Sequence, residues 1–362
     1  MKKGLYIHIP FCKRKCRYCD FYSLPCRGRV PDAYIDRVLE EIARYGDNTF
    51  DTIYLGGGTP SLLSAGQVNR ILSSVRYVED AEITLEANPD SLTKENLEGY
   101  RKAGVNRLSI GVQSVSDTQL RILGRLHDRN GAERAFRLAR EAGFENINGD
   151  VMLGLSNYTK KEMTDTIDFL IDNGVTHISA YMLKVEEGTP FYDDPPENLS
   201  NEEELSEFYL EACSYLESIG FRQYEISNFA RDGMVSRHNM IYWKMDDYLG
   251  IGPAAYSCWN GKRFHYDRDL DSFMRDPHVI HDGTVDVDEY IMLSLRLSDG
   301  LDLTELKKKW GYALNDRTTR EMYLLNDQGL LKFDGNRIAL TPQGFLVENS
   351  ISSEIMRNIY PI

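Results

Sequence analysis

Long hydrophobic runs are missing from this sequence of 362 residues. No stretch approaches the roughly 18 apolar residues that cross a bilayer, and the mean hydropathy is −0.43. A membrane-spanning protein is therefore not expected. Positive charge is also scarce, because 42 Lys and Arg stand against 56 Asp and Glu, which gives a net charge of −14. Since nucleic-acid phosphates require a basic surface, this balance disfavours a nucleic-acid partner.

A secretory leader is not expected at the start of the sequence. The N-terminal residues 4–11 are mostly apolar, but His8 and Pro10 interrupt them and no small-residue cleavage site follows. We therefore expect a cytoplasmic protein. At roughly 150 residues per domain, the length corresponds to about two domains with a sizeable core.

Cysteine is too rare for a disulfide scaffold, and its distribution is uneven. Two of the six cysteines, Cys213 and Cys258, are remote, whereas four crowd the start of the chain: Cys12, Cys16, Cys19 and Cys26. At this cysteine frequency, the spacing Cys-x3-Cys-x2-Cys would arise by chance with a probability of about two in a thousand. The cluster therefore indicates metal chemistry.

Three kinds of site remain open for this cluster. Three thiolates can hold a four-iron, four-sulfide cluster and leave one iron without a protein ligand, free for a substrate or cofactor. A structural zinc site would require a fourth ligand, and paired hooks are the usual pattern. The third interpretation is that these cysteines are free thiols that bind no metal. Cys26 could supply a fourth ligand, but the adjacent Pro25 and the distance from Cys19 favour a free thiol.

The first half of the chain alternates β-branched runs with amphipathic stretches, a pattern typical of βα units around parallel strands. Helices are expected between the runs, for example over 33–44, 67–75, 94–103 and 132–142. Six units predict an α/β fold with a partial (βα)6 barrel, because a full barrel typically needs about 250 residues. The predicted strands are 5–9, 52–55, 82–87, 107–111, 146–152 and 175–181.

The remainder of the chain predicts a second, mainly helical unit. A linker at 193–196 precedes a long helix over 202–219 and a strand over 220–226, and an aromatic, glycine-rich segment follows. Helices over 287–297, 303–310 and 316–327 and strands over 330–333 and 337–340 give the order of a small winged-helix-like domain. The predicted boundaries are 1–230 for the barrel with its extension, 231–285 for the connecting segment and 286–362 for the C-terminal domain.

The cysteine motif resembles that of a known family. The run from Tyr6 to Phe21 is similar to the radical S-adenosylmethionine (SAM) superfamily, and within it to the group of the oxygen-independent coproporphyrinogen III oxidase HemN and the haem chaperone HemW. Further matching motifs extend the resemblance over almost the whole chain: Gly56-Gly57-Gly58-Thr59-Pro60, Glu86-Ala87-Asn88-Pro89, Gly111-Val112-Gln113-Ser114, Leu123-Gly124-Arg125-x-His127 and His238-Asn239-x-x-Tyr242-Trp243.

The resemblance implies a set of cofactors and their ligands. Cys12, Cys16 and Cys19 would hold a [4Fe-4S] cluster whose open iron is chelated by SAM, and the reduced cluster would split SAM into methionine and a 5′-deoxyadenosyl radical. The positions that match SAM-binding residues or shield the cluster are Tyr6, Tyr18, Gly57, Gly58, Thr59, Glu86, Gln113, Arg125 and Asp150. From the residues alone, an ion pair between Arg125 and Asp150 or ordinary strand packing would explain several of them.

A helical turn from His238 to Trp243 would place His238 and Tyr242 on one face and Asn239 and Trp243 on the next. Haem iron accepts a neutral imidazole, and aromatic rings pack well against a porphyrin. In HemW-like proteins the motif is associated with haem binding, so the resemblance implies His238 as a haem contact. The alternative is a histidine that is hydrogen-bonded within an aromatic core.

The oxidase and chaperone branches of the group can be distinguished by their sequences. The oxidase branch has a fourth cysteine two residues after the third and a long N-terminal extension. This chain has Phe21 at that position, and Cys12 comes soon after Met1. The resemblance therefore favours a haem chaperone over an enzyme that decarboxylates coproporphyrinogen III. Its implied partners are haem, or a porphyrinogen substrate, and an unidentified haem-acceptor protein, which could be a membrane protein met transiently. A tRNA-modifying enzyme of the superfamily is disfavoured by the acidic charge.

Overall fold

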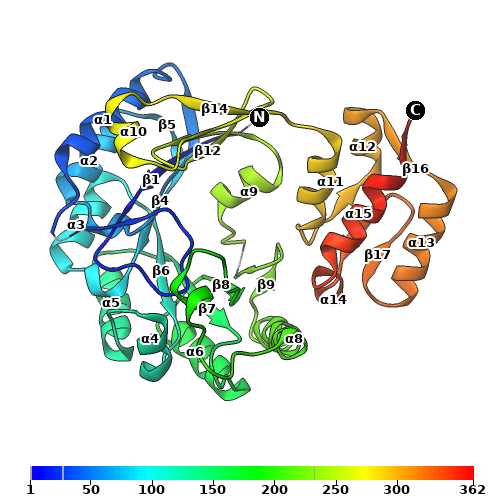
Figure 1. Cartoon of the computed structure of the whole chain (residues 1–362), viewed down its shortest axis with the longest axis horizontal. Coiled ribbons are helices and arrows are strands. Elements are labelled where there is room, and N and C mark those ends of the chain that lie inside the picture. The colour runs from blue at the N-terminus through cyan, green and yellow to red at the C-terminus, as the bar shows by residue number, and fades with distance from the viewer. Residues whose placement is uncertain (1, 27, 232) are drawn as a thin grey trace.

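A computed structural model describes residues 2–26, 28–231 and 233–362. Its centre is a curved sheet whose parallel strands are surrounded by helices (Figure 1). The six predicted barrel strands are all present and run parallel to one another: β1 (Lys3–Ile9), β4 (Thr49–Gly57), β5 (Arg76–Ala87), β6 (Arg107–Gln113), β7 (Asn146–Leu153) and β8 (His177–Met182). The predicted α/β partial barrel is thus confirmed.

Helices cover the outer face of these strands. Each covering helix lies between consecutive strands in the sequence and buries an apolar stripe against the sheet. Local signals fix their ends: Ser64 and Thr159 form capping boxes, and Gly104 takes the left-handed conformation after its helix. The helices are α1 (Asp32–Ala43), α2 (Ala65–Ser73), α3 (Lys94–Ala103), α4 (Asp117–Leu123), α5 (Arg129–Glu141), α6 (Lys160–Asp172) and α8 (Glu202–Ser218). Short elements complete this part: β2 (Phe11–Cys12), β3 (Leu24–Pro25), the 3-10 turns η1 (Pro60–Leu62) and η2 (Pro89–Ser91), and α7 (Pro190–Asp193).

The sheet extends beyond the predicted barrel at both edges. On one side β11 (Asp247–Ile251) pairs in parallel with β1 and is followed by the antiparallel strands β12 (Tyr256–Trp259), β13 (Lys262–Tyr266) and β14 (Val279–Thr284). On the other, β10 (Asn228–Ala230) and β9 (Arg222–Gln223) follow β8. The segment 231–285, which we expected to be a connector, therefore contributes four strands to the sheet, together with α9 (Arg237–Trp243) and α10 (Leu270–Arg275).

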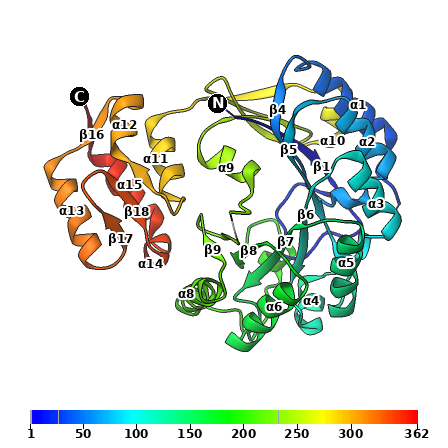
Figure 2. The ribbon, with the colours of Figure 1, turned by 180° about the vertical axis from the view of Figure 1, so that it is seen from behind.

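The C-terminal part forms a separate lobe (Figure 2). The predicted helices and strands appear as α11 (Val287–Leu295), α12 (Leu303–Trp310), α13 (Asp316–Asp327), β17 (Leu331–Phe333) and β18 (Arg337–Leu340). The sequence reading missed the later α15 (Glu348–Asn358), which is rich in Ser and Asn but buries Ile351 and Ile355. Further short elements are β15 (Leu301–Asp302), β16 (Tyr312–Leu314), α14 (Pro342–Phe345) and β19 (Ile359–Pro361).

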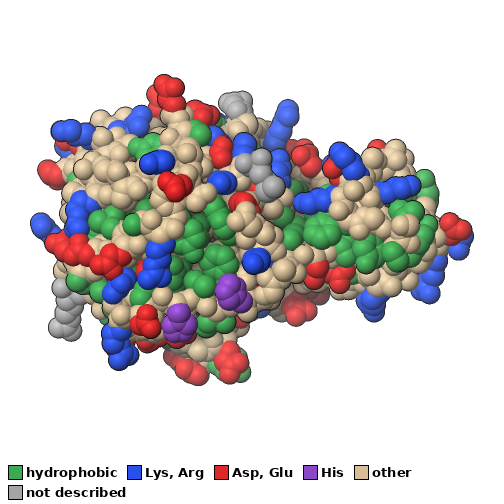
Figure 3. Space-filling view, turned by 90° about the horizontal axis from the view of Figure 1, so that it is seen from above, with side chains coloured by type: hydrophobic (Ala, Val, Ile, Leu, Met, Phe, Trp, Pro, Cys, Tyr) green, Lys and Arg blue, Asp and Glu red, His purple; other side chains and the backbone are tan. Residues whose placement is uncertain are grey.

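In the described residues, no helix is both long and apolar enough to cross a membrane. Charges of both signs are mixed over the face shown in Figure 3, where a stretch of hydrophobic surface crosses the middle.

Candidate functional site

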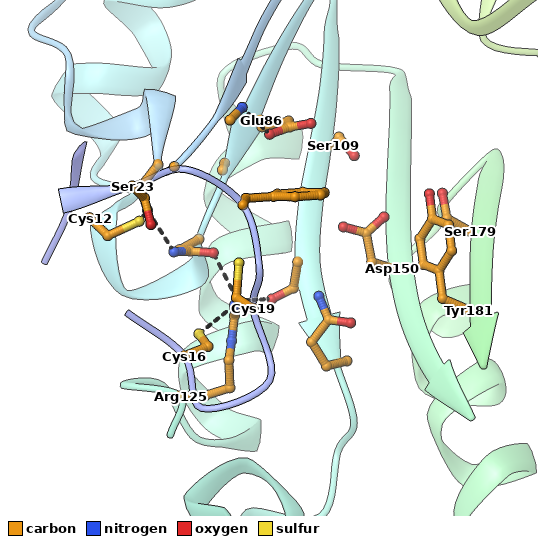
Figure 4. A pocket seen from close by; sticks show the side chains of 18 of the residues that line it. Cys12, Cys16, Cys19, Ser23, Glu86, Ser109, Arg125, Asp150, Ser179 and Tyr181 are labelled. Atoms are coloured by element: carbon orange, nitrogen blue, oxygen red, sulfur yellow. Dashed lines mark hydrogen bonds between the residues drawn. The ribbon is translucent and has the colours of Figure 1, made fainter. Parts of the chain in front are cut away.

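A cavity of about 310 Å³ opens where the parallel strands end. The predicted residues that line it are Cys12, Cys16, Tyr18, Cys19, Gly57, Gly58, Thr59, Glu86, Gln113, Arg125 and Asp150. Figure 4 shows the three cysteines on one side and Asp150, Ser179 and Tyr181 on the other. The chain thus brings most of the predicted site residues to one place, as parallel strands bring together side chains that are distant in sequence.

The cysteine loop is held at both of its ends. The short strands β2 and β3 pair with each other, and the Cys26 amide donates to the Cys12 carbonyl at 2.7 Å. In the middle of the loop, the Arg17 amide donates to the Leu123 carbonyl at 3.1 Å, at the end of α4. These backbone bonds fix the loop across the mouth of the barrel.

The thiols of this loop have polar partners. The Thr59 hydroxyl lies 3.4 Å from Cys12 Sγ, and Arg125 Nη1 lies 3.6 Å from Cys16 Sγ. Burial raises the pKa of the Cys12 thiol and raises that of Cys19 to about 11, so both are protonated at neutral pH without a bound metal. Among the described residues, no group of three or more His, Cys, Asp or Glu side chains is close enough to hold a single metal ion.

Glycines after β4 bring the backbone close to the strand of the cysteine loop. Gly57 has a φ of +109°, and a Cβ there would lie 2.4 Å from the His8 ring. A Cβ on Gly58 would lie 2.8 Å from the backbone oxygens of Ile9 and Phe11. Any side chain at these positions would push the two strand ends apart, so the tight approach requires glycine.

Glu86 ends β5 with its carboxylate in the cavity wall. One oxygen accepts from Tyr54 OH at 2.8 Å, and the other accepts from the Gly57 amide at 3.0 Å. Burial raises the pKa of this carboxyl to about 7, against these two bonds, which favour the charged form. The group can therefore hold or release a proton near neutral pH.

Two buried polar groups in the cavity wall lack partners within the described chain. Gln113 has a φ of +70°, which is unusual for a residue other than glycine, and its Oε1 accepts no hydrogen bond. The guanidinium of Arg107, at the start of β6, is 2% exposed, and its Nε is unbonded. A buried polar atom without a partner is costly, so both groups fit a polar ligand in the cavity.

Arg125 and Asp150 have separate partners. The Arg125 guanidinium donates to Asn88 Oδ1 at 2.8 Å and to the Gly111 carbonyl, beside its contact with Cys16. Asp150 accepts from the Asn148 amide at 2.7 Å, and burial holds the pKa of its carboxyl above the usual value. Each side chain is therefore positioned by its own neighbours at the cavity.

The helical turn predicted at His238 is present as α9, but its His238 side chain does not line the cavity. Its ring is fully buried and lies 2.6 Å from Thr52 Oγ1 through Nδ1 and 2.6 Å from Tyr242 OH through Nε2. The alternative reading, a hydrogen-bonded core histidine, describes this geometry. Ligation of haem by His238 stays a prediction, and it requires the ring to lose one of these bonds. From the same turn, Asn239 does line the cavity.

Tyr6 is the other predicted residue that lies apart from the cavity lining. Its hydroxyl lies 2.9 Å from His8 Nδ1, and its ring stacks on Tyr54. It lines a second, neighbouring cavity. Cys26 lies near the cysteine loop, where its thiol donates to the Arg29 carbonyl at 3.5 Å, while Cys213 and Cys258 are buried elsewhere.

The sequence reading missed a polar network deeper in the barrel. Asn148 donates to the Ser109 hydroxyl and accepts from His177, whose other ring nitrogen bonds Tyr224 OH at 2.8 Å. The sequence signal for this network is the alternation of polar residues along β7, at Asn148 and Asp150. Arg107 could have been found as a charged residue within an otherwise apolar strand.

Comparisons with known proteins cover almost the whole chain. Residues 6–170 match the model of the radical SAM superfamily, and residues 283–347 match the HemN C-terminal domain. The chain is 35% identical to "Heme chaperone HemW" of Bacillus subtilis, over 96% of this chain and 98% of that protein. It is 40% identical to the Escherichia coli protein of the same name, over 70% of this chain and 69% of the other.

A solved structure shares the fold. Coproporphyrinogen III oxidase (HemN) from Escherichia coli, described as a radical SAM enzyme, superposes with a TM-score of 0.82 at 22% identity and covers 97% of this chain and 89% of its own. At that identity the likeness concerns architecture alone. The extensive identity to the HemW proteins and the superfamily match together place the sequence: the chain belongs to the HemW family within the radical SAM superfamily.

Proposed function

We propose that this chain binds a [4Fe-4S] cluster and SAM and acts as a haem chaperone that passes haem to acceptor proteins. The observation that carries the proposal is the 35% identity to "Heme chaperone HemW" of Bacillus subtilis along nearly the full length of both chains. Membership of the superfamily implies the cluster and SAM.

The donor set fits the cluster. The thiols of Cys12, Cys16 and Cys19 line one cavity from one loop, and thiolates are the usual ligands of iron–sulfur clusters. An iron–sulfur cube bonds each thiolate through a different iron, so it takes donors at separate points around it. Three cysteines leave one iron of the cube without a protein ligand. Phe21, which takes the place of a fourth cysteine, is exposed and brings no donor.

The opposite wall fits SAM, which carries an ammonium, a carboxylate and ribose hydroxyls. Glu86 and Asp150 provide acceptors, and the unpaired Gln113 and Arg107 provide polar atoms that need partners. When bound, SAM supplies radical chemistry in this superfamily. In the proposed chaperone, SAM and the cluster control haem transfer, while the residues of the chain bind and orient both.

The test is an anaerobic assay with reconstituted protein, reductant and SAM. With haem and a haem-free acceptor protein, we expect haem transfer. With coproporphyrinogen III instead of haem, we expect no protoporphyrinogen IX. Formation of protoporphyrinogen at catalytic rates would reject the chaperone proposal in favour of an oxidase.

A further inference from the structure

The cavity beside the cysteine loop, here named the cluster cavity, has a polar inner wall. Along β6, Arg107, Ser109 and Gln113 all line it, although the two ends of this strand lie about 20 Å apart by the usual rise per residue. Figure 4 shows Ser109 and Glu86 at the end of the cavity away from Cys16. The interior of a parallel barrel is normally filled by branched apolar side chains. A cavity with polar walls at this depth therefore indicates room for a polar ligand.

Arg107, the first residue of β6, lies at the inner end of the cluster cavity without a partner. Its side chain is 2% exposed, and no hydrogen bond or ion pair of its guanidinium is found among the described residues. Its neighbours in the sheet register are Thr84 on β5 and Asn146 on β7. The buried oxygens of these two side chains, Oγ1 and Oδ1, are also unbonded in the described chain, so neither accepts from the guanidinium. A buried charge without a partner is strongly unfavourable, so Arg107 is available to a ligand.

The nearby carboxylates bond to other groups. Both oxygens of Glu86 accept hydrogen bonds, and Asp150 accepts from Asn148. The oxygens of Glu82 accept from the first two backbone amides of α9. Burial raises the pKa of the Glu86 carboxyl to about 7, so this group carries only part of a negative charge at neutral pH. None of these acids therefore pairs directly with Arg107.

SAM and water do not supply the missing charge. SAM carries a single carboxylate, and chelation of the open iron at the cysteine loop uses it. Ribose hydroxyls and water molecules can accept hydrogen bonds from a guanidinium, but they are neutral. A carboxylate accepts paired, charge-assisted hydrogen bonds from the fork of an arginine and neutralises it. The buried guanidinium of Arg107 therefore fits the carboxylate of a second molecule.

The cavity also limits the size of this molecule. Its volume is about 310 Å³, at the lower end of the range of roughly 300–1,000 Å³ that is typical of small-molecule sites. Met152 and Tyr54 line it together with the polar residues, so the carbon atoms of a ligand have apolar contacts. Since the same cavity also receives SAM, the second ligand must be small.

We propose that the inner end of the cluster cavity binds a small organic acid beside SAM, with Arg107 holding its carboxylate through paired hydrogen bonds. This inference rests on the proposed function for the place of SAM, and it goes beyond that function by adding a second ligand. The acid lies with its carboxylate at Arg107 and its carbon atoms toward SAM.

The test uses propionate as the probe and propionamide, which has a similar shape without the charge, as its neutral match. Both are titrated by calorimetry into the anaerobically reconstituted chain with saturating SAM. We expect propionate to bind at least about tenfold more tightly than propionamide. Arg107→Met should remove this preference, and Arg107→Lys should retain part of it, because lysine keeps the charge without the fork. Arg320→Met, at an exposed position on α13, is the control and should keep the full preference.

Two results of the titration would overturn the inference. One is equal affinity of the unaltered chain for propionate and propionamide, and the other is a preference for propionate that Arg107→Met retains. Thermal unfolding without propionate adds a check. Because the charge that is removed is unpaired, Arg107→Met should unfold at the temperature of the unaltered chain or above it. A clear drop would show that the guanidinium has a structural partner, which would also overturn the inference.

The proposed function is tested separately on the same preparations. Haem transfer to an acceptor protein reports on the chaperone activity and does not depend on whether Arg107 selects propionate. Transfer with equal binding of the two probes would overturn the organic-acid site alone. Selective binding of propionate without haem transfer would reject the proposed function and leave this site standing.

Discussion

Replacing Glu86 by Gln should change how the stability of the protein depends on pH. The Glu86 carboxyl has its pKa raised by burial to about 7, against an ordinary value of 4.5. Between these two values the folded chain keeps a proton that the unfolded chain loses. The bound proton therefore stabilises the folded chain fully below pH 4.5, and this stabilisation is lost as the pH rises through 7.

The magnitude follows from the difference of the two values. A pKa difference of about 2.5 lowers the free energy of unfolding by roughly 3 kcal/mol at high pH. About 2 kcal/mol of this loss should develop between pH 5.5 and pH 8. Glutamine cannot ionise, and its amide can still bond Tyr54 OH while its oxygen accepts from the Gly57 amide. The free energy of unfolding of Glu86→Gln, relative to that of the unaltered chain, should therefore rise by about 2 kcal/mol between pH 5.5 and pH 8.

Urea unfolding of the metal-free proteins at pH 5.5 and pH 8 measures this difference. Glu133→Gln on α5 is the matched control, because Glu133 is exposed, and its midpoint should follow that of the unaltered chain. A stability gap between Glu86→Gln and the unaltered chain that does not change with pH would refute the argument, since it would mean that Glu86 keeps the same charge throughout.

Three further substitutions test other parts of the site. Cys16→Ala should lose the iron and sulfide of the reconstituted protein, whereas Cys26→Ala, outside the cavity lining, should retain them; equal metal content in both variants would contradict the ligand assignment. Gly58→Ala should lower stability by about 1–3 kcal/mol because its Cβ meets backbone oxygens at 2.8 Å, while Gly66→Ala within α2 should stabilise by about 0.5–1 kcal/mol, as measured by thermal unfolding. His238→Ala should lower stability by about 2–4 kcal/mol, because the two buried hydroxyls that bond its ring lose their partner, and an unchanged melting temperature would contradict the buried network.

The barrel and the cysteine loop were readable from the sequence because their signals are local. Alternating β-branched and amphipathic runs identify each βα unit, and the spacing of Cys12, Cys16 and Cys19 falls within one loop. The strand β11 was missed for the opposite reason. Its pairing with β1 joins residues more than two hundred positions apart, and the local sequence around Asp247–Ile251 gives no signal of that contact.

The site was only partly predictable for the same physical reason. Glu86 and Gln113 could be placed because they lie at the ends of strands, and the ends of parallel strands meet. The orientation of His238 could not be placed, because it depends on Thr52, which lies on a distant strand.

The central claim is that three thiolates hold an iron–sulfur cluster with one iron open to an outside molecule. The most direct measurement is metal and sulfide analysis of the anaerobically reconstituted chain, joined to electron paramagnetic resonance of its reduced form with and without SAM. The account predicts about four irons and four sulfides per chain and a spectrum that changes when SAM is added. Zinc in place of iron, or a cluster spectrum that SAM leaves unchanged, would contradict it.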